Sequence, residues 1–234
     1  METKVAFITG GSKGIGLGIA EELIKNNIKV AITGRDAVNI KEAELHLNTI
    51  VPDSALGLSA DVRNYNSMSR ALEETLTKWG KVDYLIANAG VGHFGSIEDL
   101  TSEQWNDTID INLTGVFNSV KICLEQIKAN KGYIITISSL AGTNFFEKGS
   151  AYNASKFGLV GFSQAIMLDL RKYGVKVTTI MPGSVSTHFN DHVPSDSDSW
   201  KIQPEDIGQM VMDLLKMNPR TLPSKIEVRP SQTK

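Results

Sequence analysis

Tyr152 and Lys156 lie four residues apart in the segment Ser150-Ala-Tyr-Asn-Ala-Ser-Lys156, and Ser139 precedes Tyr152 by thirteen residues. If Tyr152 lies near the start of a helix, this spacing places its side chain and that of Lys156 on one helix face. An ammonium group beside a phenol favours the phenolate, so we expect Tyr152 to have a pKa below its usual value of about 10. These residue types therefore predict proton transfer to or from an oxygen atom close to Ser139.

Short β-branched segments alternate with longer segments of helical periodicity, and these elements must position the three residues. The predicted strands span 5–8, 29–33, 55–60, 82–87, 132–138, 175–181 and 225–228. The predicted helices span 15–24, 64–79, 102–129, 150–173 and 204–217, and a further helix begins after its cap, Asp36. We therefore expect one α/β domain over residues 1–234, with a Rossmann-like, doubly wound parallel sheet of about seven strands and helices on both faces.

The stretch 188–200 departs from this alternation. It is rich in Ser, Asp and His, contains Pro194 and shows no period. We expect a mobile surface loop beside the substrate, within about 186–203.

Composition excludes several classes of function. The chain has 24 Lys and Arg against 26 Asp and Glu, a net charge of −2, so neither nucleic acid nor an anionic membrane is an expected partner. Cys123 is the sole cysteine and the four histidines are scattered, so we expect no intrachain disulfide and no metal site. A signal-peptide layout and a membrane-length apolar stretch are both lacking, and we expect a cytoplasmic protein.

A glycine-rich turn, Thr9-Gly-Gly-Ser-Lys-Gly-Ile-Gly16, follows the first predicted strand. Glycines let the backbone approach a ligand, and the following helix directs free N–H groups at an anion. The spacing of Gly10, Gly14 and Gly16 departs from the G-x-G-x-x-G fingerprint, so the turn alone could be an ordinary tight corner. Its place at the first strand–helix corner of a doubly wound sheet favours a dinucleotide.

The end of the second predicted strand bears on the choice between the two nicotinamide dinucleotides. Sites that prefer NAD place a carboxylate here, whereas this chain has Gly34 followed by Arg35, and Lys13 lies in the glycine turn. Two cations without an acid suit the 2′-phosphate of NADP(H), unless Lys13 and Arg35 are ordinary solvated charges. We interpret Asp36 as a helix cap rather than a ribose ligand.

These motifs together resemble the short-chain dehydrogenases/reductases, and the resemblance covers essentially the whole chain. It rests on Thr9-Gly-Gly-Ser-Lys-Gly-Ile-Gly16, Asp61-Val62, Asn88-Ala89-Gly90, Asn112, Ser139, Tyr152, Lys156, Pro182-Gly183 and Thr187. Each motif alone is weak, but their joint order and spacing are specific. The family usually carries two asparagines before Ala-Gly, whereas this chain has Ala87-Asn88.

The resemblance implies a catalytic group of four residues. Tyr152 would be the general acid in reduction and the general base in oxidation, and Ser139 would hydrogen-bond the substrate oxygen. Lys156 would bind the nicotinamide ribose and lower the pKa of Tyr152. The carbonyl of Asn112 would hold a water that extends a proton relay from Lys156. From the residues alone, Ser139 could instead cap a turn and Asn112 could bind local backbone.

The resemblance also implies the residues that bind the cofactor. Asp61 and Val62 would flank the adenine, Asn88 would support the cofactor wall, and Thr187 would contact the nicotinamide carboxamide, although Thr187 could be only a loop hydroxyl. The full expected set is Gly10, Ser12, Lys13, Gly14, Ile15, Gly16, Arg35, Asp61, Val62, Asn88, Ala89, Gly90, Tyr152, Lys156, Pro182, Gly183, Val185 and Thr187.

The expected activity is hydride transfer between NADP(H), with NAD(H) less favoured, and a small carbonyl or secondary alcohol substrate. The residues expected to bind this substrate are Ser139, Tyr152, His93, Phe145 and Phe189, and Phe94 and Phe146 also lie near the chemistry in sequence. They predict an apolar pocket with a few polar groups. His93 could instead be an exposed loop residue, as loop histidines more often are.

Two alternatives stay open. The first is a 3-oxoacyl-[acyl-carrier-protein] reductase, although the chain lacks the glycine-rich tail of those enzymes and its loop carries Asp191, Asp196 and Asp198, which would repel an acidic carrier. The second is a sensor that binds NADP(H) without turnover. The presence of Ser139, Tyr152 and Lys156 argues against it.

The helix that contains Tyr152 is apolar on several faces. A helix of this kind is buried on two sides, one of which faces the sheet. We expect the other side to face a second subunit, as in the dimers and tetramers of the family, and hence a homodimer or homotetramer.

Overall fold

Across residues 3–232, which the computed structural model describes, parallel strands form one sheet of seven. The strands are β1 Val5–Thr9, β2 Lys29–Gly34, β3 Ala55–Ser59, β4 Tyr84–Ala87, β5 Tyr133–Ile137, β6 Lys176–Pro182 and β7 Lys225–Val228. Their order is β3-β2-β1-β4-β5-β6-β7, so the direction of winding reverses between β1 and β4. The expected doubly wound sheet is therefore confirmed, and in such sheets ligands bind beyond the carboxyl ends of the strands.

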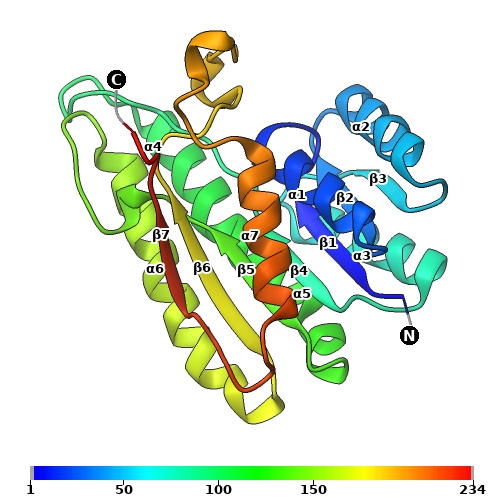
Figure 1. Cartoon of the computed structure of the whole chain (residues 1–234). Coiled ribbons are helices and arrows are strands. Elements are labelled where there is room, and N and C mark those ends of the chain that lie inside the picture. Colours follow the sequence, from blue (N-terminus) through cyan, green and yellow to red (C-terminus); the bar gives the residue numbers. More distant parts are fainter. Residues whose placement is uncertain (1–2, 233–234) are drawn as a thin grey trace.

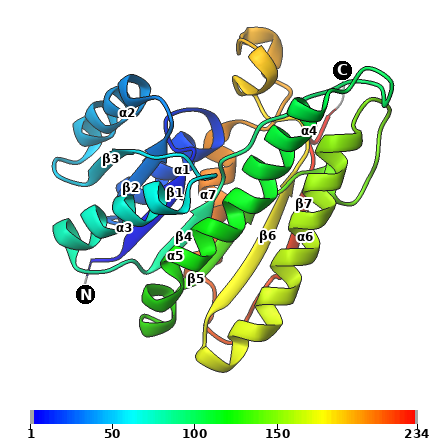
Figure 2. The same cartoon turned by 180° about the vertical axis from the view of Figure 1, so that it is seen from behind.

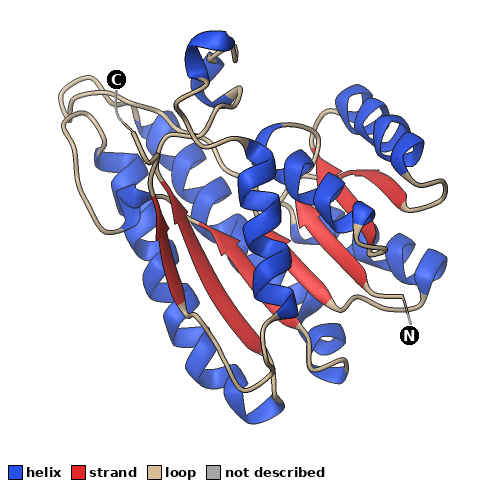
Figure 3. Cartoon of the chain, viewed as in Figure 1, coloured by secondary structure: helices blue, strands red, loops and turns tan. Residues whose placement is uncertain are grey.

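Helices cover both faces of the sheet, as Figure 1 and the reverse view in Figure 2 show. They are α1 Gly14–Lys25, α2 Ala37–Ile50, α3 Tyr65–Trp79, α4 Ser102–Ile109, α5 Gly115–Ala129, α6 Ser150–Leu170 and α7 Pro204–Lys216. Buried side chains of α1, α2 and α7 form one core cluster, and those of α3, α5 and α6 form the other. The result is a three-layer α/β arrangement with the strands in the middle (Figure 3).

The strand β1 shows why the sequence produces two cores. Its five residues are all buried, so the chain has a continuous apolar run here instead of an apolar–polar alternation. Phe7 packs into the cluster on one face and Ile8 into the cluster on the other. Successive side chains of a strand point to opposite faces, so a strand covered by helices on both sides must be apolar at every position.

The helix predicted over 102–129 consists of three pieces. Between α4 and α5, residues Asp110–Thr114 form a π-helical segment. A π turn inserts one extra residue into an α-helix and is mostly a single turn within it, so the helical pattern continues on both sides. Periodicity therefore predicted the helical region and missed the turn, which carries Asn112.

The segment 186–203 projects beyond the carboxyl edge of the sheet and is drawn in orange in Figure 1. It contains two short 3₁₀ turns, Phe189–Asp191 and Asp196–Asp198, and Val185 pairs with Ile202 at its base. Asp198 is buried and accepts hydrogen bonds from Lys201, at 2.6 Å, and from the backbone N–H of Ser195. The segment thus has internal order that its composition did not predict.

None of the helices within residues 3–232 is long and apolar enough to cross a bilayer.

Candidate active site

Tyr152 and Lys156 occupy the first two turns of α6, beside the end of β5. The Lys156 ammonium lies 5.6 Å from the centroid of the Tyr152 ring and donates a hydrogen bond to the Ile137 carbonyl at 3.2 Å. Ser139 begins the turn that follows β5, and its side chain hydrogen-bonds Tyr152. Ser139 Oγ also accepts a hydrogen bond from the Ala141 N–H at 3.1 Å, so it does cap a turn, as the alternative interpretation held. The structure brings these three side chains together.

Burial shifts the two ionisable groups of this cluster in opposite directions. It raises the pKa of Tyr152 to about 12, although the hydrogen bond with Ser139 lowers it in part. It lowers the pKa of Lys156 to about 8. The expectation that Tyr152 has a pKa below about 10 is therefore wrong for the protein groups alone, because burial disfavours the phenolate more than the Ser139 hydrogen bond favours it. Tyr152 is a neutral phenol at neutral pH and can donate a proton.

Asn112 connects the loop after β4 with α6. Its Oδ1 accepts a hydrogen bond from the Val91 N–H, and its Nδ2 donates to the Val91 carbonyl, both at 2.8 Å. The same Nδ2 donates to Ser155 Oγ at 3.0 Å, directly before Lys156. Since Asn112 is fully buried, these bonds hold the loop, the π-helical segment and α6 in register. The expected water relay through its carbonyl stays a prediction.

Asn88 fixes the glycine turn to the end of β4. Its Nδ2 donates to the carbonyls of Thr9, at 3.0 Å, and Gly10, at 2.9 Å. Gly10 has φ +66°, and a Cβ atom on Gly16 would lie 2.2 Å from the Gly10 carbonyl oxygen. Both glycines are therefore required by the geometry of the turn. The second asparagine that the family usually has is replaced by Ala87, the buried last residue of β4.

The amino terminus of α1 fits an anionic ligand. The side chains of Asp36, Asn64 and Thr101 cap α2, α3 and α4, whereas Lys13 at the start of α1 makes no such cap, and the first turn of α1 has no acid. The N–H groups of the first turn of α1 are thus available to a phosphate oxygen. This arrangement suits the pyrophosphate of a dinucleotide.

The far end of this cofactor site contains the residues expected to choose between NADP(H) and NAD(H). A Cβ atom on Gly34 would lie 3.6 Å from Ser12 Oγ, so the end of β2 and the glycine turn meet. Lys13 and Arg35 are exposed there. Asp36 accepts hydrogen bonds from the N–H groups of Val38 and Asn39, so its predicted role as a helix cap is confirmed.

Asp61 lies close to the same corner. Its carboxylate is held by Arg63, whose Nη2 is 2.6 Å from Oδ2, and this hydrogen bond, together with the charge of Arg35, lowers the pKa of Asp61. Arg63 also donates to Asp107 at 2.9 Å. Val62 beside it is buried and packs against Gly115.

The remaining expected cofactor residues lie at the ends of β4 and β6. A Cβ atom on Gly90 would be 3.6 Å from Lys156 Nζ. Gly14 in the glycine turn faces Thr187, because a Cβ atom on Gly14 would lie 3.3 Å from the Thr187 side chain. Gly183 donates its N–H to the Val228 carbonyl at 2.8 Å, which pins the end of β6. The glycine turn and the segment after β6 therefore lie side by side, as a dinucleotide site requires.

The structure separates the expected substrate residues. Phe189 lies against Tyr152, with 5.6 Å between ring centroids. His93 instead pairs with Asp107, with 3.0 Å between Nε2 and Oδ2, and Phe145 is 86% exposed.

Phe94 contacts the Tyr152 ring at 5.4 Å and Phe146 contacts Phe94 at 5.9 Å. Sequence position alone could not distinguish Phe94 from His93 or Phe146 from Phe145, because loop residues lack a period that fixes their direction.

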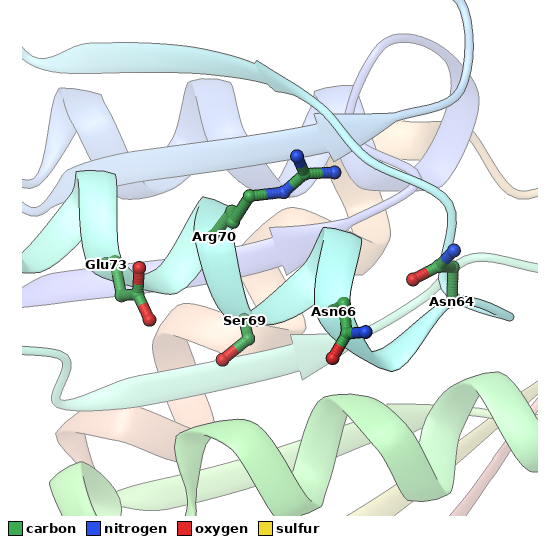
Figure 4. A pocket seen from close by; sticks show the side chains of 5 residues that line it. All are labelled: Asn64, Asn66, Ser69, Arg70 and Glu73. Carbon is green, nitrogen blue, oxygen red and sulfur yellow. The ribbon is translucent and has the colours of Figure 1, made fainter.

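A shallow depression of about 500 Å³ lies on α3 (Figure 4). It is lined by Asn64, Asn66, Ser69, Arg70 and Glu73, which come from α3 and its cap. In Figure 4, Arg70 points toward the strands, while Ser69 and Glu73 point the other way. Side chains from one helix that diverge in this manner do not surround a ligand, so the depression is a solvated surface.

The chain is similar to known proteins over nearly its whole length. A family model described as short chain dehydrogenase matches residues 4–198. An uncharacterized oxidoreductase of Staphylococcus saprophyticus subsp. saprophyticus is 31% identical over 235 residues, which cover 98% of this chain and 98% of that protein.

Solved structures match equally broadly. An alcohol dehydrogenase from the archaeon Thermococcus sibiricus, complexed with 5-hydroxy-NADP, matches with a TM-score of 0.93 and 26% identity over 100% of this chain and 99% of that one. A 3-ketoacyl-(acyl-carrier-protein) reductase from Brucella melitensis, complexed with NADH, matches with a TM-score of 0.89 and 25% identity over 98% of each chain.

Proposed function

This chain belongs to the short-chain dehydrogenase family of oxidoreductases, and on that premise we propose that it transfers a hydride between NADP(H) and a carbonyl or secondary alcohol. The observation that carries the proposal is the meeting of Ser139, Tyr152 and Lys156 beside the end of β5, next to Gly90 and the glycine turn. A proton donor, a hydroxyl that can hold an oxygen and a dinucleotide-binding corner together suit reversible carbonyl reduction.

Each of the three side chains has a distinct role in this proposal. Ser139 Oγ holds the substrate oxygen, and the Tyr152 hydroxyl donates a proton to that oxygen during reduction. Lys156 binds the ribose hydroxyls, and Asn112 holds α6 in place through Ser155. The nicotinamide, when bound, supplies the hydride in reduction and accepts it in oxidation.

The preference for NADP(H) is supported by the corner after β2. Gly34 has no carboxylate, and the Asp36 carboxylate caps α2. Lys13 and Arg35 are exposed close to Ser12. The similarity to a dehydrogenase complexed with 5-hydroxy-NADP is consistent with this choice, whereas the reductase complexed with NADH shows that the fold also accepts the other form. Initial rates with NADPH and NADH at equal concentration test the preference directly.

Replacement of Tyr152 by Phe tests the assignment of the acid. The ring stays and the hydroxyl is lost, so we expect kcat for carbonyl reduction to fall by roughly 10²-fold or more. NADPH binding, followed by fluorescence titration, should change little. Tyr173→Phe is the matched control, because Tyr173 lies exposed at the end of α6 and should keep full activity. Near-normal turnover by Tyr152→Phe would refute the proposed role.

The acyl-carrier-protein reductase remains the second candidate, since one similar structure is such an enzyme. One objection to it is weaker than the sequence implied: Asp198 is buried and paired with Lys201 and His192, so it presents little charge to a carrier. Reduction of a carrier-linked 3-oxoacyl thioester much faster than of free ketones would favour this candidate. Binding of NADPH without turnover of any carbonyl would instead favour a sensor.

We also propose a homodimer or homotetramer, with a cytoplasmic location. Phe117 on α5 and Phe162 on α6 contact each other at 6.4 Å near the surface, and Phe117, Phe157 and Leu168 are exposed. Exposed apolar side chains that gather on two neighbouring helices are typical of a subunit interface.

A further inference from the structure

Two phenylalanines from separate loops contact Tyr152, and a third from another loop contacts one of them. Phe94 follows β4, Phe146 follows β5 and Phe189 follows β6. The ring of Phe94 lies 5.4 Å from that of Tyr152, 6.3 Å from that of Phe189 and 5.9 Å from that of Phe146. The three loops therefore converge beside the Tyr152 ring, which carries the hydroxyl that is proposed to donate the proton. We call Phe94, Phe146 and Phe189 the aromatic wall.

These rings are not part of either core. Phe94 is 40% exposed, Phe146 48% and Phe189 38%, although each packs against another ring. Apolar side chains that gather at the surface next to a reactive group mark a ligand-binding site more often than a packing defect. The angles between the ring planes range from 50° to 68°, so the wall offers both ring edges and ring faces.

Gly92 lets two of these rings approach each other. A Cβ atom at this position would lie 2.6 Å from Phe189 Cζ and 2.8 Å from Phe94 Cζ. The φ angle of Gly92 lies outside the left-handed region, so the backbone itself would accept a side chain. What glycine provides here is room for the two rings.

Asn153 holds the loop that presents Phe146. Its Nδ2 donates to the carbonyls of Ala141, at 2.7 Å, and Asn144, at 2.8 Å, and its Oδ1 accepts from the Phe146 N–H at 3.4 Å. Asn153 is buried and directly follows Tyr152. The position of this ring is thus tied to the catalytic helix itself.

The polar side chain next to Phe94 is already paired. His93, next to Phe94, is paired with Asp107, which in turn binds Arg63. Lys148, two residues after Phe146, is exposed, and its carbonyl accepts a hydrogen bond from the Gly95 N–H, so one cation also lies in these two loops.

We propose that the aromatic wall selects ketones whose carbonyl carbon is bonded to an aromatic ring. This inference rests on the proposed carbonyl reduction. The ketone becomes a secondary alcohol as its carbon gains a hydride and its oxygen gains the Tyr152 proton, while the reduced dinucleotide is oxidised. Edge-to-face contacts with Phe94 and Phe189 stabilise a bound ring more than a straight alkyl chain.

The test compares acetophenone with a straight-chain methyl ketone of equal carbon number, with NADPH as reductant. We expect the wild-type protein to prefer acetophenone in kcat/KM by roughly tenfold, the effect of one or two ring contacts. Gly92→Ala should remove most of this preference by forcing the two rings apart. The loss should come mainly from a higher KM for acetophenone, since Ser139, Tyr152 and Lys156 are untouched.

Gly95→Ala is the matched control. It lies in the same loop, and its Cβ atom would meet only Leu100, at 3.7 Å or more, which is ordinary contact. It should keep the wild-type preference. Phe94→Leu removes a ring but keeps apolar volume, so it tests the same contact if Gly92→Ala fails to fold.

The outcomes separate this inference from the proposed function. Loss of the preference in Gly92→Ala and Phe94→Leu, with retention in Gly95→Ala, supports the aromatic wall. An unchanged preference in Phe94→Leu, or faster wild-type reduction of the straight-chain ketone, overturns the wall and leaves carbonyl reduction standing. If the wild-type protein reduces no carbonyl with either dinucleotide, the proposed function itself fails.

Discussion

Tyr152 and Lys156 differ from the free amino acids because Lys156 is buried and Tyr152 is half-buried. Burial raises the pKa of the phenol to about 12 and lowers that of the ammonium to about 8. Each shift disfavours the charged form, as expected for groups that have lost their hydration. A protonated phenol is the form that reduction needs, whereas oxidation needs the phenolate.

This asymmetry predicts different pH profiles for the two directions. Between pH of about 6 and 10, carbonyl reduction should depend little on the state of Tyr152, because the phenol stays protonated. Alcohol oxidation should rise with pH, since the phenolate fraction grows tenfold per unit below the pKa of about 12. Steady-state rates in both directions across this range check the prediction. Oxidation that reaches a plateau below neutral pH would contradict it.

We expect burial of Lys156 to lower the free energy of unfolding at neutral pH, although the proposed function needs this side chain. Its pKa is about 8 in the folded protein and 10.5 when unfolded, so the unfolded chain binds more protons between these values. The free energy of unfolding should therefore rise as pH increases from 8 to 10.5. Below this window the buried ammonium costs about 3 kcal/mol, an upper value because relaxation reduces it.

Lys156→Met should accordingly abolish reduction yet raise the free energy of unfolding at neutral pH by about 1–3 kcal/mol. Denaturant titrations at several pH values would show this gain and the loss of the pH dependence. Lys25→Met is the control, because Lys25 is exposed on α1 and should change neither quantity much. A less stable Lys156→Met protein would argue that the ammonium is stabilised by its surroundings.

At the scale of secondary-structure elements, the π-helical segment Asp110–Thr114 joins the two halves of the site. It places Asn112 between Val91, in the loop after β4, and Ser155, on α6. A regular helix would have one residue fewer in this turn and would rotate the side chains that follow. The π-helical segment therefore positions the loop after β4 relative to α6, and it does so through the Asn112 side chain.

Asn112→Ala tests this role. It leaves the Val91 N–H and carbonyl without their partner in a buried place, which costs about 2 kcal/mol. For a chain of this size we expect the melting temperature to fall by roughly 4–8 °C. Asn106→Ala on α4, an exposed asparagine, serves as the control in the same thermal unfolding series. An unchanged melting temperature for Asn112→Ala would mean that these hydrogen bonds are replaced by water at no cost.

At the scale of the whole molecule, the site exists because parallel strands end at one edge. The glycine turn follows β1, Arg35 follows β2, Asn88 follows β4, Ser139 follows β5 and Thr187 comes shortly after β6. Residues scattered over most of the chain are thereby brought to one edge, on either side of the switch between β1 and β4. The loops at this edge of the sheet can differ in sequence without changing the core, so the aromatic wall can be specific to one class of substrate.

The exposed apolar surface of α5 and α6 leads to a prediction about assembly. Light scattering after size exclusion should give the mass of a dimer or tetramer at micromolar protein concentration. Phe157→Glu would place a charge in that interface and should shift the population toward monomer, since a buried unpaired charge is costly. Lys172→Glu, beyond the end of α6, should leave the assembly intact. A monomeric wild-type protein would refute the interface.

Much of this molecule was determined by the sequence alone. Buried strands have apolar runs, helices have caps such as Asp36 and Asn64, and tight turns need glycine, because these depend on local sterics and on whether a segment is covered. The alternation of strands and helices then determined the doubly wound sheet. The spacing of Tyr152 and Lys156 determined that their side chains share a helix face.

Only the tertiary structure decided which loop side chains reach Tyr152 and how the cluster ionises. Phe94 contacts Tyr152 and Phe146 contacts Phe94, whereas their neighbours His93 and Phe145 point elsewhere, and no periodicity distinguishes neighbours in a loop. The pKa of Tyr152 rises because atoms from distant segments exclude water, an effect that residue spacing cannot reveal. Where a loop side chain points, and how far it is buried, depends on how the loop packs against the rest of the chain.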